Sequence, residues 1–422
     1  MLFFIGIAMQ QLSLFNHKSR VECADYQPEA LPIITLDELF EAYFSCRRNK
    51  RNTTNALAFE VDYEAKLLAL YEDINNGSYQ PARSIAFIVN QPVKREVFAA
   101  DFRDRVVHHL IINKLNPLFE KLFIYDSYAC RTGKGTHFGI RRVERFIRQC
   151  SQNYSKDCYV LKLDVKGFFM HIDKTILFSR LQHFIEQKYQ QTDKAVLIAL
   201  CKTTVYNDPT QNCAVKSKRS EWKGLPNDKS LFHSFAGTGL PIGNLTSQVF
   251  ANLYMNSFDH FIKHDLGIRY YGRYVDDFIL VHHNKAYLTS LVGLIQKHLK
   301  DNLKLTLHPK KIYLQHYSKG VQFLGAVIKP NRIYSANRTK GNFYSSIQKQ
   351  NLVVKKHKPS IEQQSQFLSI MNAYLGALQH YNTYKLRKAM LFKHLSNWWW
   401  ERVYASGGMT KLVLRTKPIK QK

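Results

Sequence analysis

The stretch IRYYGRYVDDFILVH, residues 268–282, places two adjacent carboxylates, Asp276 and Asp277, between two apolar runs. The runs predict two strands that meet at this pair, so both acids are expected at the turn of a β-hairpin. Neighbouring anions repel each other and resist burial, and a bound divalent cation removes that cost. Asp is also a common turn residue, so a solvated turn is the alternative. The apolar flanks, with neither Asn nor Gly beside the pair, favour a metal-binding turn.

The composition indicates a folded and strongly basic protein. Its 422 residues are 45% hydrophobic, and 61 Lys and Arg against 32 Asp and Glu leave a net charge of +29. A chain of this length can hold two or three subdomains, each with its own core. The charge favours a polyanionic partner, with nucleic acid the first candidate and a membrane surface the second. No apolar run approaches the roughly 20 residues of a spanning helix.

The cysteines and the N-terminal segment add little chemistry. Seven dispersed cysteines without a C-x-x-C pair suggest neither a disulfide framework nor a zinc site, and they fit a reducing cytosol. The opening MLFFIGIAM is too short an apolar segment for a signal peptide, and translation could start at Met1 or Met9. Residues 36–44 predict an amphipathic helix. The basic run 47–51 after it either contacts nucleic acid or lies on a solvated face.

Residues 83–111 combine short apolar runs with basic residues. They predict a hairpin that carries Lys94 and Arg95, followed by a helix. The apolar positions of this helix recur at helical spacing, at Val106, Leu110 and Ile111.

A glycine-rich cationic loop is expected at residues 126–137. Gly133 and Gly135 stand beside Arg131 and Lys134, so backbone amides and basic side chains could approach phosphate groups there. The same Gly-Lys-Gly pattern is frequent in ordinary loops, which leaves both interpretations open.

Residues 158–164, CYVLKLD, predict a buried strand that ends on Asp164. Phe169 follows shortly after, and Asp173 is placed to cap the next helix. A strand-end carboxylate close to an aromatic ring can form part of a nucleotide pocket. A lone strand-end Asp is more often a cap or a turn residue.

The middle of the chain contains a polar segment and a second glycine-containing turn. Residues 206–235 are polar and irregular, which predicts a surface insertion. The turn at 239–244 opens a predicted helix at 245–262. Its core-facing side is expected to comprise Val249, Phe250, Leu253, Tyr254 and Phe258.

The C-terminal part reads as helical. A helix is expected at 285–299, and the last hundred residues show one long helical pattern. One face of that pattern carries Phe367, Met371, Leu375 and Leu378. A tryptophan triplet, residues 398–400, and a basic tail follow. Aromatics among Lys and Arg suit base stacking and phosphate contact, although core packing is their commoner fate.

The order of these features resembles the fingers and palm of reverse transcriptases over roughly residues 83–384. The resemblance implies an α+β, right-hand polymerase fold, with fingers, an antiparallel palm sheet flanked by helices, and a helical thumb. Residues 1–80 would form an N-terminal helical and basic region, and 81–157 the fingers. The palm would span 158–327, with a polar insertion near 206–236. The thumb and a basic tail would occupy 328–422.

The resemblance also assigns a catalytic site. Asp164 and Asp276 would bridge two Mg²⁺ ions, or Mn²⁺, with weaker help from Asp277 and a contribution from the Val165 carbonyl. Polymerisation needs such carboxylates because the two ions stabilise the attacking and leaving oxygens of phosphoryl transfer. Lys311 would approach the pyrophosphate, although its neighbour Lys310 also qualifies.

Substrate contacts follow from the same resemblance. Arg131, with Lys94 or Arg95, would hold the triphosphate, and Phe169 would exclude a 2′-hydroxyl group and so favour dNTPs. Phe323, Leu324 and Gly325 would form the primer grip, and a helix around residues 374–386 the thumb. The nucleic-acid partners would be a template RNA and a cDNA or DNA primer.

One position departs from the general family pattern. Most reverse transcriptases carry Gln-Gly at the turn before the helix, with Ser-Pro further on, whereas here the pair is Ile242-Gly243. GLPIGNLTSQ, with KSLF, YGRYVDD, LHPKKIYLQ and AYLGALQHYNTYKLR, resembles the reverse transcriptases of diversity-generating retroelements. These cytoplasmic enzymes of bacteria, archaea or phages copy a template-repeat RNA with errors at adenines. They act with a small, basic, helical accessory protein, which is oligomeric. Ile242 is expected to loosen the nucleotide pocket and so to lower the cost of mispairing.

Two other functions remain open. A phage-defence or retron-type reverse transcriptase shares the palm but makes cDNA for immunity. A non-catalytic nucleic-acid-binding relative is disfavoured because Asp164, Asp276 and Asp277 are all present. The sequence shows no His-Asn-His or zinc-ligand endonuclease pattern and no RNase H-like set of carboxylates.

Overall fold

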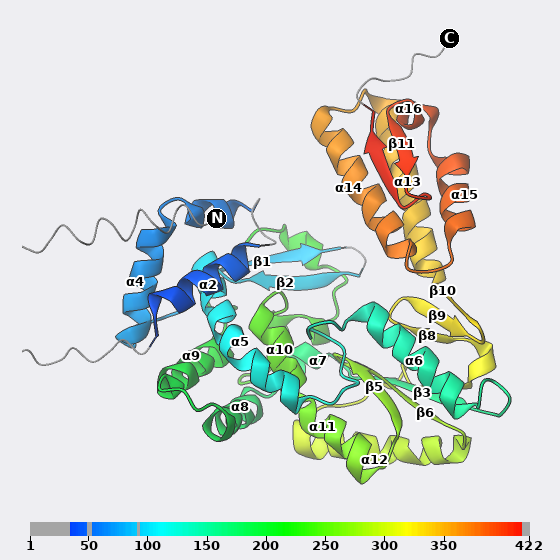
Figure 1. The fold of residues 1–422 in the computed structure, drawn as a ribbon. Helices are drawn as coiled ribbons and strands as arrows, with labels where there is room; N and C mark the ends of the chain where they lie inside the picture. Colours follow the sequence, from blue (N-terminus) through cyan, green and yellow to red (C-terminus); the bar gives the residue numbers. More distant parts are fainter. Residues whose placement is uncertain (1–33, 49–52, 91–92, 416–422) are drawn as a thin grey trace, which may run out of the picture. The chain divides into compact units, whose positions relative to one another are not determined.

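The computed structural model describes residues 34–48, 53–90 and 93–415. Helices and mainly antiparallel sheets make up these ranges (Figure 1), which confirms the predicted α+β class. Within them, no helix is long and apolar enough to cross a membrane, and the cysteines form no disulfide bond. Predictions for residues 1–33, including the choice between Met1 and Met9, and for residues 49–51 of the basic run lie outside the described ranges.

A four-stranded antiparallel sheet positions the candidate site. Its strands follow the order β5 (Tyr270–Tyr274), β6 (Asp277–His282), β3 (Tyr159–Asp164) and β7 (Tyr313–His316). Successive strand residues point to opposite faces of a sheet, so β6 needs apolar residues at consecutive positions if both faces are covered. All four residues from 278 to 281 are buried, which shows that both faces of the sheet are packed.

Each face of this sheet packs against its own hydrophobic core. Phe278 and Leu280 belong to a large core shared with several helices, whereas Ile279 and Val281 belong to a second one. The helices of the large core include α5 (Phe102–Leu122), α8 (Lys174–Lys188), α9 (Lys194–Tyr206), α10 (Leu245–Tyr254), α11 (Asn256–His260) and α12 (Lys285–Leu303). The second core lies between the sheet, α6 (Thr136–Cys150) and the small sheet of β8 (Val321–Phe323), β9 (Ala326–Lys329) and β10 (Arg332–Ser335).

The main helical predictions are confirmed. The predicted core positions of α5 and of the 245–262 segment are all buried. Asp173 caps α8, since its carboxylate accepts hydrogen bonds from the Thr175 and Ile176 N–H groups, both at 2.9 Å. The predicted helix 245–262 is divided, however, because α10 ends at Tyr254 and a π-helical turn, Phe261–Asp265, follows α11.

The segment predicted as a surface insertion is largely exposed, and three of its residues also add a short strand to a sheet. β4 (Cys213–Val215) pairs in parallel with β1 (Ser84–Val89), which pairs antiparallel with β2 (Arg95–Ala99). Three short 3₁₀ helices follow β4. The sequence does not predict this strand, because three residues are too few for a periodic signal and the segment around them is polar.

The N-terminal helices are α2 (Leu36–Arg47), α3 (Thr54–Glu60) and α4 (Tyr63–Asn75).

The C-terminal residues form a unit with its own core. The predicted apolar face of Phe367, Met371, Leu375 and Leu378 is confirmed, since all four side chains are buried in this core. The unit contains α13 (Asn337–Lys356), α14 (Ile361–Leu378), α15 (Tyr384–His394), α16 (Asn397–Trp400) and the hairpin of β11 (Val403–Ser406) and β12 (Lys411–Leu414). The chain leaves the helix after Leu378, within the expected thumb helix. Trp399 is fully buried and stacks on Phe367 with ring centroids 3.7 Å apart, so it packs in the core.

Candidate active site

The acidic pair lies at a tight two-residue turn between β5 and β6. Tyr274 pairs with Asp277, so Val275 and Asp276 alone form the loop. Val275 has a φ of 58°, a left-handed conformation that a β-branched residue rarely adopts. Hairpin loops of this length normally place Gly or Asn at such a position. The turn therefore forms without the usual turn residue, and it is strained at the residue before Asp276.

The third carboxylate joins the pair through the register between β3 and β6. Asp164 is paired with Asp277 across the two strands. The Val165 N–H donates to the Asp276 carbonyl oxygen at 3.3 Å, and the His308 N–H donates to the Asp164 carbonyl oxygen at 2.8 Å. The end of β3 and the hairpin turn therefore lie side by side, and the predicted acidic residues meet at one edge of the sheet.

Two lysines neutralise part of this negative charge. The Lys311 ammonium donates to both carboxylate oxygens of Asp164, at 2.9 and 3.0 Å. The Lys162 ammonium lies 3.2 Å from Asp277 Oδ2. Lys311 thus contacts the predicted site, whereas Lys162 was missed by the sequence interpretation. Its position on β3, two residues before Asp164, was the available signal, because alternate strand residues share a face.

The remaining charge at the turn is poorly compensated. Burial, and then the nearby Asp164 carboxylate, raise the pKa of Asp276 to about 7. Burial raises the pKa of Asp277 to about 6, although Lys162 opposes the shift. Asp277 Oδ1 is buried and has no hydrogen-bond partner among the residues that the structure describes. Half-buried carboxylates that resist ionisation gain stability from a bound cation.

The ligand chemistry of these residues fits a hard divalent cation. All the candidate ligand atoms are oxygens, the type that Mg²⁺ prefers. Among the described residues Asp277 Oδ1 accepts no hydrogen bond, so this oxygen remains available to a cation. Within residues 34–48, 53–90 and 93–415, no group of three or more His, Cys, Asp or Glu side chains is arranged to hold a metal ion. Lys311 and Lys162 instead contact the oxygens of Asp164 and Asp277.

The residues predicted to contact the nucleotide are partly brought together. Phe169 and Ile242 both pack against a small core of Ala86, Phe98, Met170 and Leu231. The Phe98 N–H donates to the Ile242 carbonyl oxygen at 2.9 Å, which ties β2 to the turn before α10. Gly243 has a φ of 125°, and a Cβ there would lie 2.8 Å from Val97 Cγ1. Glycine is therefore required at this close approach.

Lys94, just before β2, and Arg95, its first residue, precede a buried anchor that the sequence interpretation missed. Arg95 is exposed, and the Lys94 ammonium donates to the Lys223 carbonyl oxygen at 2.7 Å. Between them and the rest of β2 lies Glu96, only 1% exposed. Its carboxylate accepts hydrogen bonds from Trp222 Nε1 at 2.6 Å, Ser230 Oγ at 2.8 Å and the Leu231 N–H at 2.5 Å. Through these three hydrogen bonds the Glu96 carboxylate holds the 206–236 segment against β2.

Arg131 does not lie where the triphosphate contact was expected. Its guanidinium donates to Glu120 Oε2 at 2.9 Å and to the carbonyl oxygens of Ile124 and Ser127 at 2.5 and 3.2 Å. The side chain is 4% exposed. In this conformation Arg131 holds the 123–131 loop to the end of α5 and is not available to a phosphate.

The predicted primer grip is a tight hairpin turn. Leu324 and Gly325 have positive φ angles of 47° and 82° between β8 and β9. Phe323 is fully buried beneath the turn. The predicted palm–thumb boundary, between residues 327 and 328, falls inside β9.

A buried ion pair contacts the backbone of the acidic turn. Arg273 and Asp259 are both fully buried, and Arg273 Nη1 also donates to the Val275 carbonyl oxygen at 2.9 Å. The sequence interpretation assigned Arg273 no role. A charged residue inside a strand predicted to be buried was a usable signal, because such charges need partners.

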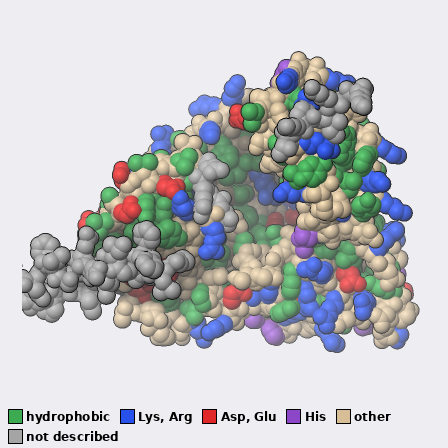
Figure 2. Space-filling model, turned by 45° about the horizontal axis from the view of Figure 1, so that its top comes forward, with side chains coloured by type: hydrophobic (Ala, Val, Ile, Leu, Met, Phe, Trp, Pro, Cys, Tyr) green, Lys and Arg blue, Asp and Glu red, His purple; other side chains and the backbone are tan. Residues whose placement is uncertain are grey.

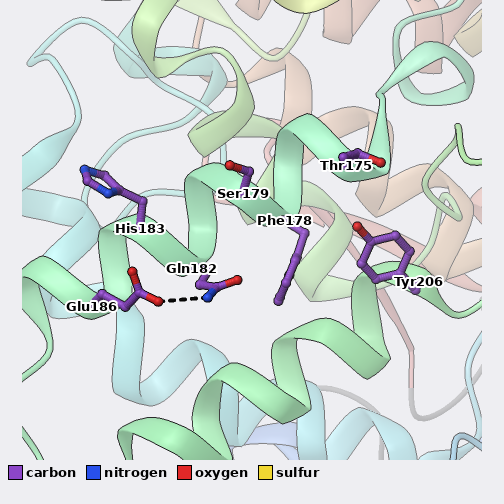
Figure 3. A pocket seen from close by; sticks show the side chains of 7 residues that line it. All are labelled: Thr175, Phe178, Ser179, Gln182, His183, Glu186 and Tyr206. Atoms are coloured by element: carbon purple, nitrogen blue, oxygen red, sulfur yellow. Dashed lines mark hydrogen bonds between the residues drawn. The ribbon is translucent and has the colours of Figure 1, made fainter.

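Two surface pockets are lined by other residues. One pocket of 360 Å³ is lined by α8 residues and by Tyr206 at the end of α9 (Figure 3). Its polar side chains are largely engaged with each other or open to solvent, and Gln182 donates to Glu186 at 2.8 Å. None of the predicted catalytic residues lines it.

The surface is strongly basic. Figure 2 shows Lys and Arg side chains spread over the face drawn, where Asp and Glu are fewer. α6 turns Arg141, Arg145 and Arg148 to solvent. Exposed basic side chains of this kind suit the phosphate backbone of nucleic acid.

Comparisons with known proteins agree with this architecture. Residues 94–328, more than half of the chain, match the family described as "Reverse transcriptase (RNA-dependent DNA polymerase)". The chain is 23% identical over 305 residues to Protein YkfC of Escherichia coli (strain K12), covering 64% of this chain and 73% of that protein. It is 24% identical over 316 residues to Nuclear intron maturase 1, mitochondrial, of Arabidopsis thaliana, covering 59% of this chain and 43% of that protein.

Solved telomerase structures are also similar. The telomerase of Candida albicans in complex with a fragment of telomeric RNA gives a TM-score of 0.44 at 10% identity, covering 74% of this chain and 55% of that one. Apo telomerase of Candida tropicalis gives a TM-score of 0.45 at 12% identity, and the match covers 75% of this chain and 60% of the telomerase chain. The chain thus spans less than two thirds of the maturase and of both telomerase chains. The family match extends across β2, the carboxylate-bearing strands and β8. The chain therefore belongs to the reverse transcriptase family.

Proposed function

We propose that the chain copies RNA into DNA at the edge of the central sheet. The observation that carries this proposal is the convergence of Asp164, Asp276 and Asp277 through strand register, with Lys311 on Asp164. Two bound Mg²⁺ ions would stabilise the attacking and leaving oxygens of phosphoryl transfer. The three carboxylates and the Val165 carbonyl would hold these ions, and Mn²⁺ could replace Mg²⁺.

The chain's other residues would bind and orient the substrates. Phe169 would lie under the sugar of the incoming dNTP and exclude a 2′-hydroxyl, and Lys311 would approach the pyrophosphate. The β8–β9 turn would grip the primer. Residues 84–99 with β4 would act as fingers, and the unit from α13 onward as the thumb.

Primer extension on an RNA template with Mg²⁺ tests this function. Asp276→Ala/Asp277→Ala should abolish cDNA synthesis because the cation loses its ligands. Asp157→Ala is the matched control, since this side chain is 79% exposed and lies outside the site, and it should extend the primer like the parent. Absence of product from the parent, with or without a small basic helical accessory protein, would contradict the proposal.

The finer role has two candidates. The motifs around Ile242 support copying of a template-repeat RNA with errors at adenines, for diversification of a target gene. The alternative is a phage-defence or retron-type reverse transcriptase. The curated match to a bacterial protein supports this alternative better, because diversification rests on sequence motifs alone.

The error spectrum separates the two roles. If Ile242 loosens the pocket, cDNA made by the parent should carry errors concentrated opposite template adenines, and Ile242→Gln should reduce them by about 10-fold, the effect of one lost pocket contact. Sequencing of the cDNA measures both. Accurate copying of adenines by the parent would leave the polymerase function standing and remove the diversification role.

A further inference from the structure

The β5–β6 turn is connected to the buried guanidinium group of Arg273 through the Val275 carbonyl group. Arg273 Nη1 donates to the Val275 carbonyl oxygen at 2.9 Å. That carbonyl and the Asp276 N–H belong to one planar peptide group, so the orientation of one determines the orientation of the other. The position of the guanidinium therefore controls how Asp276 leaves the turn.

The guanidinium itself is held rigidly. Its Nε donates to Asp259 Oδ1 at 2.7 Å and its Nη2 to Asp259 Oδ2 at 2.6 Å, a bidentate pair in which both side chains are fully buried. Tyr271 also donates to Asp259 Oδ1, at 2.6 Å. The backbone is fixed as well, since the Arg273 N–H donates to the Asp126 carbonyl oxygen and the Tyr128 N–H to that of Arg273, both at 2.9 Å.

The turn needs such a constraint because its conformation is unfavourable. Val275 has a φ of 58°, and a β-branched residue left to itself would leave this region. Strained backbone persists only where its surroundings hold it. The hydrogen bond from Arg273 to the Val275 carbonyl oxygen is a contact able to do so.

We propose that Arg273, oriented by Asp259, is the positioning residue that presets the Val275–Asp276 peptide and so makes the three-carboxylate edge competent to bind a divalent cation. This inference rests on the proposed polymerase function for its biological meaning, but its physical content is cation affinity. Arg273 touches neither substrate nor cation, and it acts through the backbone.

The test measures Mn²⁺ binding to the full chain, by electron paramagnetic resonance of the free ion, alongside primer extension over a range of Mg²⁺ concentrations. Arg273→Lys keeps the charge beside Asp259 but lacks the planar fork that reaches Asp259 and the Val275 carbonyl together. Its Mn²⁺ dissociation constant should rise by about 10- to 100-fold, as for other residues that orient metal ligands. The Mg²⁺ concentration for half-maximal extension should rise in parallel, with unchanged affinity for the template–primer.

Tyr254→Phe is the matched control. It removes a buried hydrogen bond, from Tyr254 Oη to the Leu303 carbonyl oxygen at 2.6 Å, that contacts neither Arg273 nor Asp259, so it should lower stability while leaving Mn²⁺ binding at the parental value. Adding Val275→Gly to Arg273→Lys should restore part of the affinity, because glycine adopts positive φ without support. Asp259→Asn, which keeps the shape of the side chain, replaces Arg273→Lys if that variant does not fold.

Parental Mn²⁺ binding by a folded Arg273→Lys chain would overturn the proposal, whatever its activity. Equal weakening by Tyr254→Phe would also overturn it, since the effect would then be a general loss of stability. A parent that binds Mn²⁺ in an Arg273-dependent way but extends no primer would reject the polymerase function and retain the positioning role.

Discussion

At the scale of single residues, the function of a charged side chain depends on the partners that surround it. Arg131 is predicted from the sequence to bind phosphate and Arg273 has no predicted role, but both side chains are almost completely removed from solvent and bound to acidic partners. Such cations stabilise or position the backbone around them, whereas a phosphate-binding cation must be free to meet its ligand.

Arg131 is predicted to contribute to stability more than to substrate binding. Arg131→Gln should lower the free energy of unfolding by about 1–3 kcal/mol, because the Ile124 and Ser127 carbonyl oxygens and Glu120 lose their donor. The KM for dNTPs should stay at the parental value. Urea unfolding and steady-state primer extension measure the two quantities. Parental stability with a raised KM would restore the phosphate-binding role.

Asp104 is predicted to make stability depend on pH. It is buried and accepts hydrogen bonds from Tyr79 Oη and the Ala82 N–H, both at 2.9 Å, and burial raises its pKa from 3.8 to about 6. The folded state thus favours the protonated acid. The resulting stabilisation is complete below pH 4 and is lost as the pH rises through about 6.

The Asp104→Asn variant isolates this effect. Between pH 4 and 7, the free energy of unfolding of the parent should fall on the order of 1–3 kcal/mol more than that of the variant. Urea unfolding at a series of pH values is the measurement. Identical pH profiles for parent and variant would show that Asp104 does not titrate in this range.

At the scale of elements, short polar segments acquire structure from a few long-range bonds. β4 and the 3₁₀ helices after it have too few apolar residues to form a core of their own. Glu96 supplies an acceptor for three donors of this segment, and Lys94 adds a further contact. The segment therefore depends on β2 for its order.

Glu96→Ala is predicted to release the 206–236 segment. Trypsin should then cleave at its lysines and arginines several times faster, because local unfolding exposes the backbone. Mass spectrometry of the fragments locates the cuts. Glu221→Ala, an acid of the same segment bonded only to the nearby Lys218 N–H, is the control. Equal cleavage of the Glu96→Ala chain and the parent would show that other contacts hold the segment.

At the scale of the whole molecule, the hydrophobic cores are separate from one another, which predicts that they unfold separately. The core of residues 343–412 has its own buried residues, centred on the Phe367–Trp399 stack, and shares none with the cores of the central sheet. Three of the four tryptophans lie in this unit, at positions 398–400, so fluorescence reports chiefly on its unfolding.

Trp399→Ala is predicted to destabilise the C-terminal unit by about 3–5 kcal/mol, because it leaves a large cavity beneath Phe367. Its fluorescence transition in urea should shift to lower denaturant, while circular dichroism should retain a later transition from the rest of the chain. Trp399→Phe keeps a stacked ring and should cost less. A single coincident transition in both signals would contradict independent unfolding.

The sequence by itself determined the local features of this protein. The apolar flanks of Asp276 and Asp277 specify two strands, the end of CYVLKLD places Asp164 at a strand end, and apolar spacing identifies the buried faces of α5 and α10. These signals are visible because they depend on residues close together in the chain, and the family resemblance followed from their order.

Only the tertiary structure decided which distant groups meet. The register of β3 and β6 pairs Asp164 with Asp277, Arg273 finds Asp259, and Glu96 finds its donors more than a hundred residues away. Each partner is specified by chain packing, and no local pattern encodes it. The sequence around Arg131 predicts phosphate contact for the same reason, because no local pattern shows that its guanidinium donates to Glu120 in the fold.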